Sequence, residues 1–84
     1  MMTKYEVRAL GGYLSGSRSV WVDAIDVHHA AQLGCEKLEA DGYWRDVALP
    51  DAFTCDVRDA LDETAPYHSV VVVVESRRAF RAVL

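Results

Sequence analysis

The stretch VVVVV, from Val70 to Val74, decides the fold of this chain of 84 residues. Successive side chains of a β-strand point to opposite faces of a sheet, so an unbroken apolar run predicts a strand that is covered on both faces. We expect this strand to extend from Tyr67 to Glu75 and to be the central strand of a sheet. Because so short a chain has little material for a second covering layer, the run also predicts a folded-back tail or a partner subunit.

The segments before the valine run predict a hairpin followed by a helix. Apolar and polar residues alternate from about Lys4 to Leu10 and again from about Arg18 to Ile25, and the short connection between these strands makes them antiparallel. Asp26 is a good N-cap, and apolar residues then recur at helical spacing as far as Gly42. This pattern predicts a helix over residues 27–41.

Two later segments leave alternatives open. Alternation between Phe53 and Val57 favours a third strand, although the region 51–63 also fits a helix that begins behind Pro50. The tail from Ser76 to Leu84 fits either a short helix or a fifth strand. The predicted fold is α+β in the order ββαββ, with one antiparallel sheet packed on a single main helix and residues 1–84 forming one domain.

The alternation also predicts which side chains meet the helix. The expected inner sheet face is Tyr5, Val7, Val20, Val22, Phe53, Cys55 and one parity of the valine run, packed on Ala31, Gly34 and Leu38. Cys35 and Cys55 occupy inner positions, which predicts two buried free thiols. The other parity of the valine run shares the far face with Trp21, which predicts an apolar stripe inside a polar rim.

Composition excludes several classes of protein. The formal net charge is −4, with 51% hydrophobic and 26% charged residues, which is typical of a globular domain. A net negative chain is a poor match for nucleic acids, because phosphate contacts need clustered lysine and arginine. The sequence has neither an apolar stretch long enough to span a membrane nor an N-terminal secretion signal, so we expect a cytoplasmic protein without a membrane partner.

The residues that are able to bind metal ions or to catalyse reactions are poorly spaced for either task. Two ligands for one ion on a helix belong three or four residues apart, whereas His28 and Cys35 are separated by about two turns. The acidic run over 56–63 lacks the alternating carboxylates and the central glycine of a calcium loop. We therefore predict no catalytic residue, no cofactor, no metal ion and no enzymatic activity.

One segment carries a resemblance to known proteins. From Val20 to Gly42 the sequence VWVDAIDVHHAAQLGCEKLEADG has the pattern strand, aspartate, helix containing Ala-Ala, and glycine. It resembles the strand–Asp–helix unit of many short open reading frames in actinobacterial phages and their hosts. The resemblance implies a small accessory protein that acts by binding a host or phage protein, and it carries over no catalytic residue.

These features favour a non-enzymatic protein-interaction module, of which a phage-type regulatory or host-interaction protein is one form. The expected partners are an unidentified protein and a second copy of the chain, in a homodimer. The residues expected to make these contacts are Trp21, Val71, Val73, Arg77, Arg78, Phe80 and Arg81. Two alternatives stay open: a small antitoxin-like nucleic-acid-associated regulator that uses the basic C-terminal tail, and a small enzyme whose site forms at a dimer interface.

Overall fold

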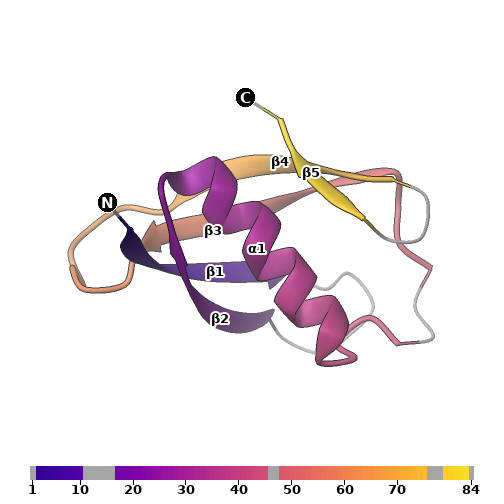
Figure 1. The fold of residues 1–84 in the computed structure, drawn as a ribbon, viewed down its shortest axis with the longest axis horizontal. Coiled ribbons are helices and arrows are strands. Elements are labelled where there is room, and N and C mark those ends of the chain that lie inside the picture. The colour runs from indigo at the N-terminus through magenta and orange to yellow at the C-terminus, as the bar shows by residue number, and fades with distance from the viewer. Residues whose placement is uncertain (1, 11–16, 46–47, 76–78, 84) are drawn as a thin grey trace.

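The computed structural model describes residues 2–10, 17–45, 48–75 and 79–83. Within these residues, five strands form one antiparallel sheet and one helix crosses one of its faces (Figure 1). The elements are β1 (Thr3–Leu10), β2 (Ser17–Ala24), α1 (Val27–Ala40), β3 (Ala52–Asp59), β4 (His68–Val74) and β5 (Phe80–Ala82). The strand order is β2-β1-β3-β4-β5. The predicted α+β fold, with one antiparallel sheet packed on a single helix, is confirmed.

The structure settles both open alternatives in favour of strands. Residues 52–59 form β3, which pairs with β1 on one side and β4 on the other. In the tail, Phe80 pairs with Val74 and Ala82 pairs with Val72, which extends the sheet by a fifth strand. A bond from the Glu75 N–H to the Ala79 carbonyl, at 2.7 Å, closes this hairpin. The Ser76 that was expected to cap a tail helix lies outside the described residues.

The position predicted for the valine strand is wrong. Strand β4 was expected at the centre of the sheet, but β3 occupies that place, with two strands on each side. The reason is that the tail adds β5 beyond β4, while β1 and β2 lie beyond β3 on the other side. Strand β4 is therefore internal but off-centre, and the two edge strands are β2 and β5.

Helix α1 begins at the predicted residue and ends at Ala40, one residue before the predicted end, with Asp41 as its C-cap. The Asp26 carboxylate accepts a hydrogen bond from the His29 N–H at 2.8 Å, which is the N-cap interaction. At the other end, Gly42 has a φ of +79°, and the Tyr43 N–H bonds back to the Leu38 carbonyl at 3.0 Å. This bond, with the one from Gly42 to Glu39, makes a Schellman motif that turns the chain back toward the sheet.

Strand alternation sorts the side chains into an inner face toward α1 and an outer face away from it. The inner side chains of the four longer strands are Tyr5, Val7, Ala9, Val20, Val22, Ala24, Phe53, Cys55, Val57, Val70, Val72 and Val74. They pack on a helix stripe that includes Ala31, Gly34 and Leu38, which are all buried. The predicted inner face is confirmed, and Cys35 and Cys55 are both buried and free, as expected.

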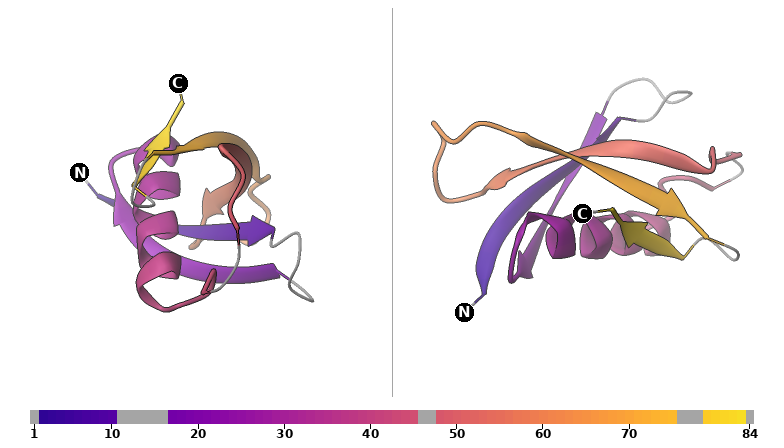
Figure 2. Two further views of the ribbon diagram at one scale, coloured as in Figure 1. Left: turned by 90° about the vertical axis from the view of Figure 1, so that its right-hand side faces the viewer. Right: turned by 90° about the horizontal axis from the view of Figure 1, so that it is seen from above.

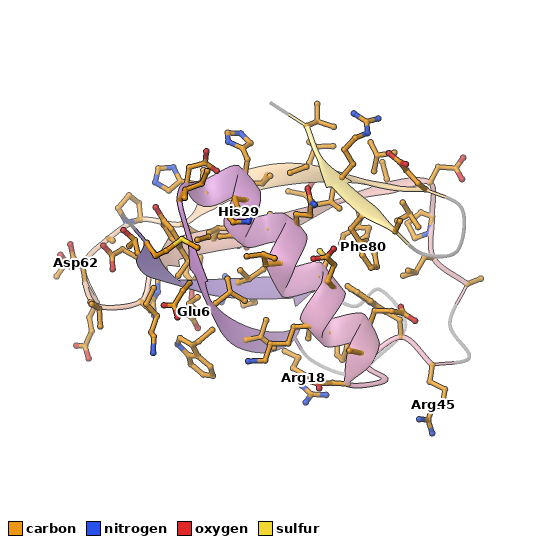
Figure 3. All side chains as sticks on the ribbon, in the orientation of Figure 1. Glu6, Arg18, His29, Arg45, Asp62 and Phe80 are labelled. Atoms are coloured by element: carbon orange, nitrogen blue, oxygen red, sulfur yellow. The ribbon has the colours of Figure 1, made fainter. Side chains whose placement is uncertain are left out.

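An aromatic cluster closes the core where the chain leaves the helix. Trp44 is only 3% exposed, and its ring centroid lies 5.5 Å from that of Phe53 and 5.4 Å from that of Phe80. Tyr43 stacks edge-on against the same indole at 5.4 Å. The sheet curls so that β5 comes beside α1 (Figure 2), and Phe80 lies between these two elements (Figure 3). The cluster therefore joins the tail, the helix end and β3.

Candidate protein-interaction surface

The described residues leave the outer face of the sheet without a covering layer. Helix α1 lies against the inner face, and no described element lies on the opposite side of β1, β3 and β4 (Figure 2). In β4, alternation turns Val71 and Val73 to this outer face, while Val70 and Val72 are buried beneath the helix. The valine run is thus covered on one side only.

The exposed apolar side chains gather at two ends of this face. Where β1 begins lie Met2, Trp21, Ile25 and Leu61, which we call the Trp21 end, and Trp21 is 54% exposed. Where β4 ends lie the exposed Val71 and Val83 and the half-buried Val73, which we call the valine end, and Val71 is 46% exposed. The Val83 N–H bonds to the Val71 carbonyl at 2.8 Å, so these two valines are cross-strand neighbours. Helix α1 contributes no exposed large apolar side chain among the described residues.

Charged side chains occupy the centre of the outer face, between the two apolar ends. This charged cluster consists of Glu6, Arg8, Asp56, Arg58 and Tyr67. Arg58 Nε donates to Glu6 Oε1 at 2.7 Å, and the Tyr67 hydroxyl donates to the same oxygen at 3.1 Å. Arg8 pairs with Asp56 at 3.3 Å. Both guanidinium groups lie over the Tyr67 ring, at 4.3 Å and 4.7 Å from its centroid, so cation–π attraction adds to the ion pairs.

The charged cluster holds Glu6 in its ionised form. The Glu6 side chain is only 14% exposed, and burial by itself raises a carboxyl pKa. Hydrogen bonds from Arg58, Tyr67 and Ser19 outweigh that effect, so the pKa of Glu6 lies below its ordinary value. With two arginines and two carboxylates paired in this way, the centre of the outer face carries no net charge.

We expect this carboxylate to make the stability of the fold depend on pH. Because the pKa of Glu6 is lower in the folded chain than in the unfolded chain, its stabilising contribution is complete above the unfolded pKa. The contribution is lost as the pH falls below the ordinary glutamate pKa and through the lower folded pKa. Urea melts across these pH values should show a steeper loss of stability for the wild type than for Glu6→Gln. Parallel profiles for the two proteins would contradict the assignment.

The predicted arrangement of the outer face is wrong. An apolar stripe inside a polar rim was expected, but the polar groups are central and the apolar groups lie at the ends. The reason is cross-strand register: Glu6 lies opposite Arg58, and Arg8 lies opposite Asp56, so opposite charges meet on the two middle strands. Trp21 on β2 lies on one side of these pairs, and Val71 and Val73 on β4 lie on the other.

The structure places the predicted contact residues in different surroundings. Trp21, Val71 and Val73 lie on the outer face, as expected. Phe80 is only 5% exposed and packs on Trp44, so the prediction that it contacts a partner is wrong. Its strand turns it inward, toward the helix. Hence the tail covers the core with Phe80 rather than shielding the far face.

The basic tail is only partly described. Arg77 and Arg78 lie outside the described residues. Arg81 is exposed on β5, and its Nε donates to Glu75 Oε1 at 2.7 Å. The charge of this arginine is therefore balanced locally, which weakens the case for a phosphate contact at this position.

One histidine of the first helical turn and one carboxylate of the acidic run over 56–63 make hydrogen bonds within the fold. His29 Nδ1 accepts a hydrogen bond from the Ile25 N–H at 3.3 Å, at the first turn of α1 (Figure 3). Asp62 accepts from the Thr64 N–H and hydroxyl in the connection between β3 and β4, which lowers the pKa of this carboxyl. Among the described residues, no group of three or more histidine, cysteine or carboxylate side chains is placed to hold a metal ion.

The free edge of the sheet at β2 is partly blocked. Lys37 of α1 donates to the backbone carbonyl of Trp21 at 3.3 Å, which occupies one outward-facing acceptor of this edge strand. Lysine at an edge discourages pairing with a further strand. The other edge, β5, is only three residues long. The sheet edges are therefore poorer contact surfaces than the outer face.

Sequence reasoning missed the charged cluster and the role of Trp44. Parity alone places Glu6, Arg8, Asp56 and Arg58 on one face, but their pairing depends on the β1–β3 register, which joins segments far apart in the sequence. For Trp44, a signal was present: a glycine at a helix end followed by two aromatic residues indicates a chain reversal that packs an apolar group back on the helix.

Comparisons of the chain with protein-family models, with curated proteins and with solved structures found no match in any of the three. The resemblance to small phage and actinobacterial accessory proteins therefore stays a prediction. No helix among the described residues is long and apolar enough to cross a membrane. Any functional conclusion must rest on the chemistry of the surface itself.

Proposed function

We propose that this protein is a non-enzymatic protein-interaction module and that the outer face of its sheet is the binding surface. The observation that carries this proposal is the one-sided distribution of exposed large apolar side chains. Trp21, Val71 and Val83 face outward by strand parity and register. Met2, Ile25 and Leu61 lie in the segments next to strand ends, and none of the exposed large apolar residues described lies on the helix. Apolar groups gathered on one face mark interaction surfaces.

The partner that fits this face is a second copy of the chain. The charged cluster is neutral, so two such faces do not repel each other when they approach. In addition, the two larger principal-axis extents of the molecule are 34 and 25 Å. One broad side of a molecule of this size is of the order of the roughly 800 Å² per partner that a standard protein interface buries. In such a dimer the apolar side chains at the two ends of the face become buried against the partner subunit. The central ion pairs fix how the two copies are oriented.

The arrangement of apolar ends and central ion pairs on the outer face is also complementary to the same arrangement on a second copy. By strand order and register, the Arg8–Asp56 pair lies midway between Trp21 and Val71. A twofold axis that passes between two facing sheets, obliquely to the strands, sets each Trp21 over Val71 of the partner subunit. The same axis brings Arg8 close to Asp56 of the partner subunit. In an isologous interface of this kind each contact occurs twice.

Light scattering at micromolar concentration tests the proposal. We expect a mass of twice the 9.4 kDa of the chain for the wild type. Val71→Lys places a charge in the apolar part of the interface and should shift the protein to monomer without unfolding it. Ala40→Lys is the matched control, because it adds the same charge at an exposed position on the helix and should leave the mass unchanged. Circular dichroism checks that both variants are folded.

A wild-type protein that is monomeric at micromolar concentration would contradict self-association. Equal masses for Val71→Lys and wild type would show that the outer face is not the contact. The nucleic-acid alternative predicts a different result, namely binding of an oligonucleotide that weakens steeply as salt rises. A homodimer of this kind leaves the helix side free for a host or phage protein, which is the accessory role that the sequence resemblance implies.

A further inference from the structure

Two buried sulfur atoms lie in direct contact in the core. Cys35, on the inward side of α1, and Cys55, on the central strand β3, have their Sγ atoms 3.3 Å apart. Both side chains are fully buried and both are free thiols. A disulfide bond needs a separation of about 2.0 Å, so the two sulfur atoms would have to move together by little more than one ångström.

The close approach has a structural cause. Gly34, which precedes Cys35, lies against Val7 of β1, and a Cβ atom at this glycine would be 2.6 Å from the Val7 Cβ atom. The helix axis therefore runs nearer to the sheet than a larger residue would permit. Since β3 is the neighbour of β1, the same approach brings the Cys35 side chain onto Cys55.

We propose that Cys35 and Cys55 form an intramolecular disulfide on exposure to a low-molecular-weight disulfide, and that this bond links the helix to the central strand. One cysteine thiolate attacks the small disulfide, which gives a mixed disulfide and releases one small thiol. The second cysteine thiolate then attacks the protein sulfur of the mixed disulfide and releases the second small thiol. The two protein sulfurs lose two electrons to the small disulfide, and the two protons leave on the released thiols.

The surroundings of the pair make this reaction slow in the folded protein. The hydrogen bond with Cys55, together with burial, raises the pKa of the Cys35 thiol, so the reactive thiolate is scarce at neutral pH. Burial also keeps a small disulfide away until the helix moves from the sheet. The reaction should therefore speed up as pH rises and as α1 opens. Once formed, the bond opposes that opening, which makes the pair a latch between helix and sheet.

Oxidised glutathione is a suitable probe. The folded chain is incubated with it at about pH 8.5, where more thiolate is present, and the products are unfolded, alkylated and weighed. We expect loss of two hydrogens with no alkylated cysteine, and a peptide map that joins Cys35 to Cys55. The bond closes a loop between residues 20 positions apart. It should raise the folding equilibrium constant on the order of a hundredfold, seen as a higher urea midpoint.

Single substitutions provide the control. Cys35→Ala and Cys55→Ala each leave one thiol, so oxidation should stop at the glutathione adduct and leave the urea midpoint near that of the reduced variant. If a variant fails to fold, the peptide map of the wild type alone still decides. Two alkylatable thiols after oxidation, a stable adduct on the wild type, or a disulfide only between chains would each overturn the proposal.

Discussion

Replacing Trp44 by alanine should lower the free energy of unfolding by about 3–5 kcal/mol, because it removes the largest side chain of the aromatic cluster. The indole is buried and contacts the rings of Tyr43, Phe53 and Phe80, so the space that it leaves cannot be filled by its neighbours without moving the tail. A domain of this size has a total stability of roughly 5–10 kcal/mol. Urea melts followed by circular dichroism should show the loss as a large fall in midpoint.

Trp44→Phe is the matched control for this prediction. A phenyl ring keeps part of the contact with Phe53 and Phe80, so we expect the loss to be less than half of that for Trp44→Ala. The variant also tells whether ring contact or side-chain volume matters at this position. An alanine variant with the wild-type midpoint would mean that the cluster does not close the core.

The second large effect is expected at Gly34. Leucine at this position should cost about 1–3 kcal/mol or more, because the helix would have to move away from β1. Even alanine is crowded, since its Cβ atom would lie 2.6 Å from Cβ and Cγ1 of Val7. Alanine gains about 1 kcal/mol of helix propensity over glycine, so a net loss of stability for Gly34→Ala would reveal the clash directly.

A double-mutant cycle with Val7 separates the clash from other effects. Val7→Ala removes the Cγ atoms that the new side chain would meet, so the combined change Gly34→Ala with Val7→Ala should cost less than the sum of the two single changes. Denaturant melts of the four proteins give the coupling free energy. Simple additivity would show that the Val7 Cγ atoms do not compete with the new side chain for the same space.

The sequence was sufficient to predict β1, β2, α1 and β4 and the faces of their side chains, because these depend on local patterns, whereas it left residues 51–63 and the tail open between helix and strand. The sequence periodicity matches the observed secondary structure in three places. These are the valine run, the alternation around Val7 and Val20, and the helix between Asp26 and Gly42. Parity then places Trp21, Val71 and Val73 on the outer face without knowledge of the strand order. These features needed no information about distant contacts.

The features that could not be predicted depend on contacts between distant segments. The strand order sets β3 rather than β4 at the centre, and the curl of the sheet brings β5 to the helix, which buries Phe80. Similarly, Glu6 and Arg58 are paired although 52 residues separate them. Local patterns contain neither the order of strands in a sheet nor the register of non-adjacent strands, so the centre of the outer face could not be read from them.

Isotope-filtered nuclear Overhauser spectroscopy on a mixture of labelled and unlabelled chains tests the proposed face-to-face pairing most directly. The experiment detects only contacts between a labelled copy and an unlabelled copy. We expect contacts between the Trp21 indole protons of one copy and the methyl groups of Val71 and Val83 of the partner subunit. A dimer whose intermolecular contacts avoid these residues, or a sample with no intermolecular contacts at millimolar concentration, would contradict the outer face as the binding surface.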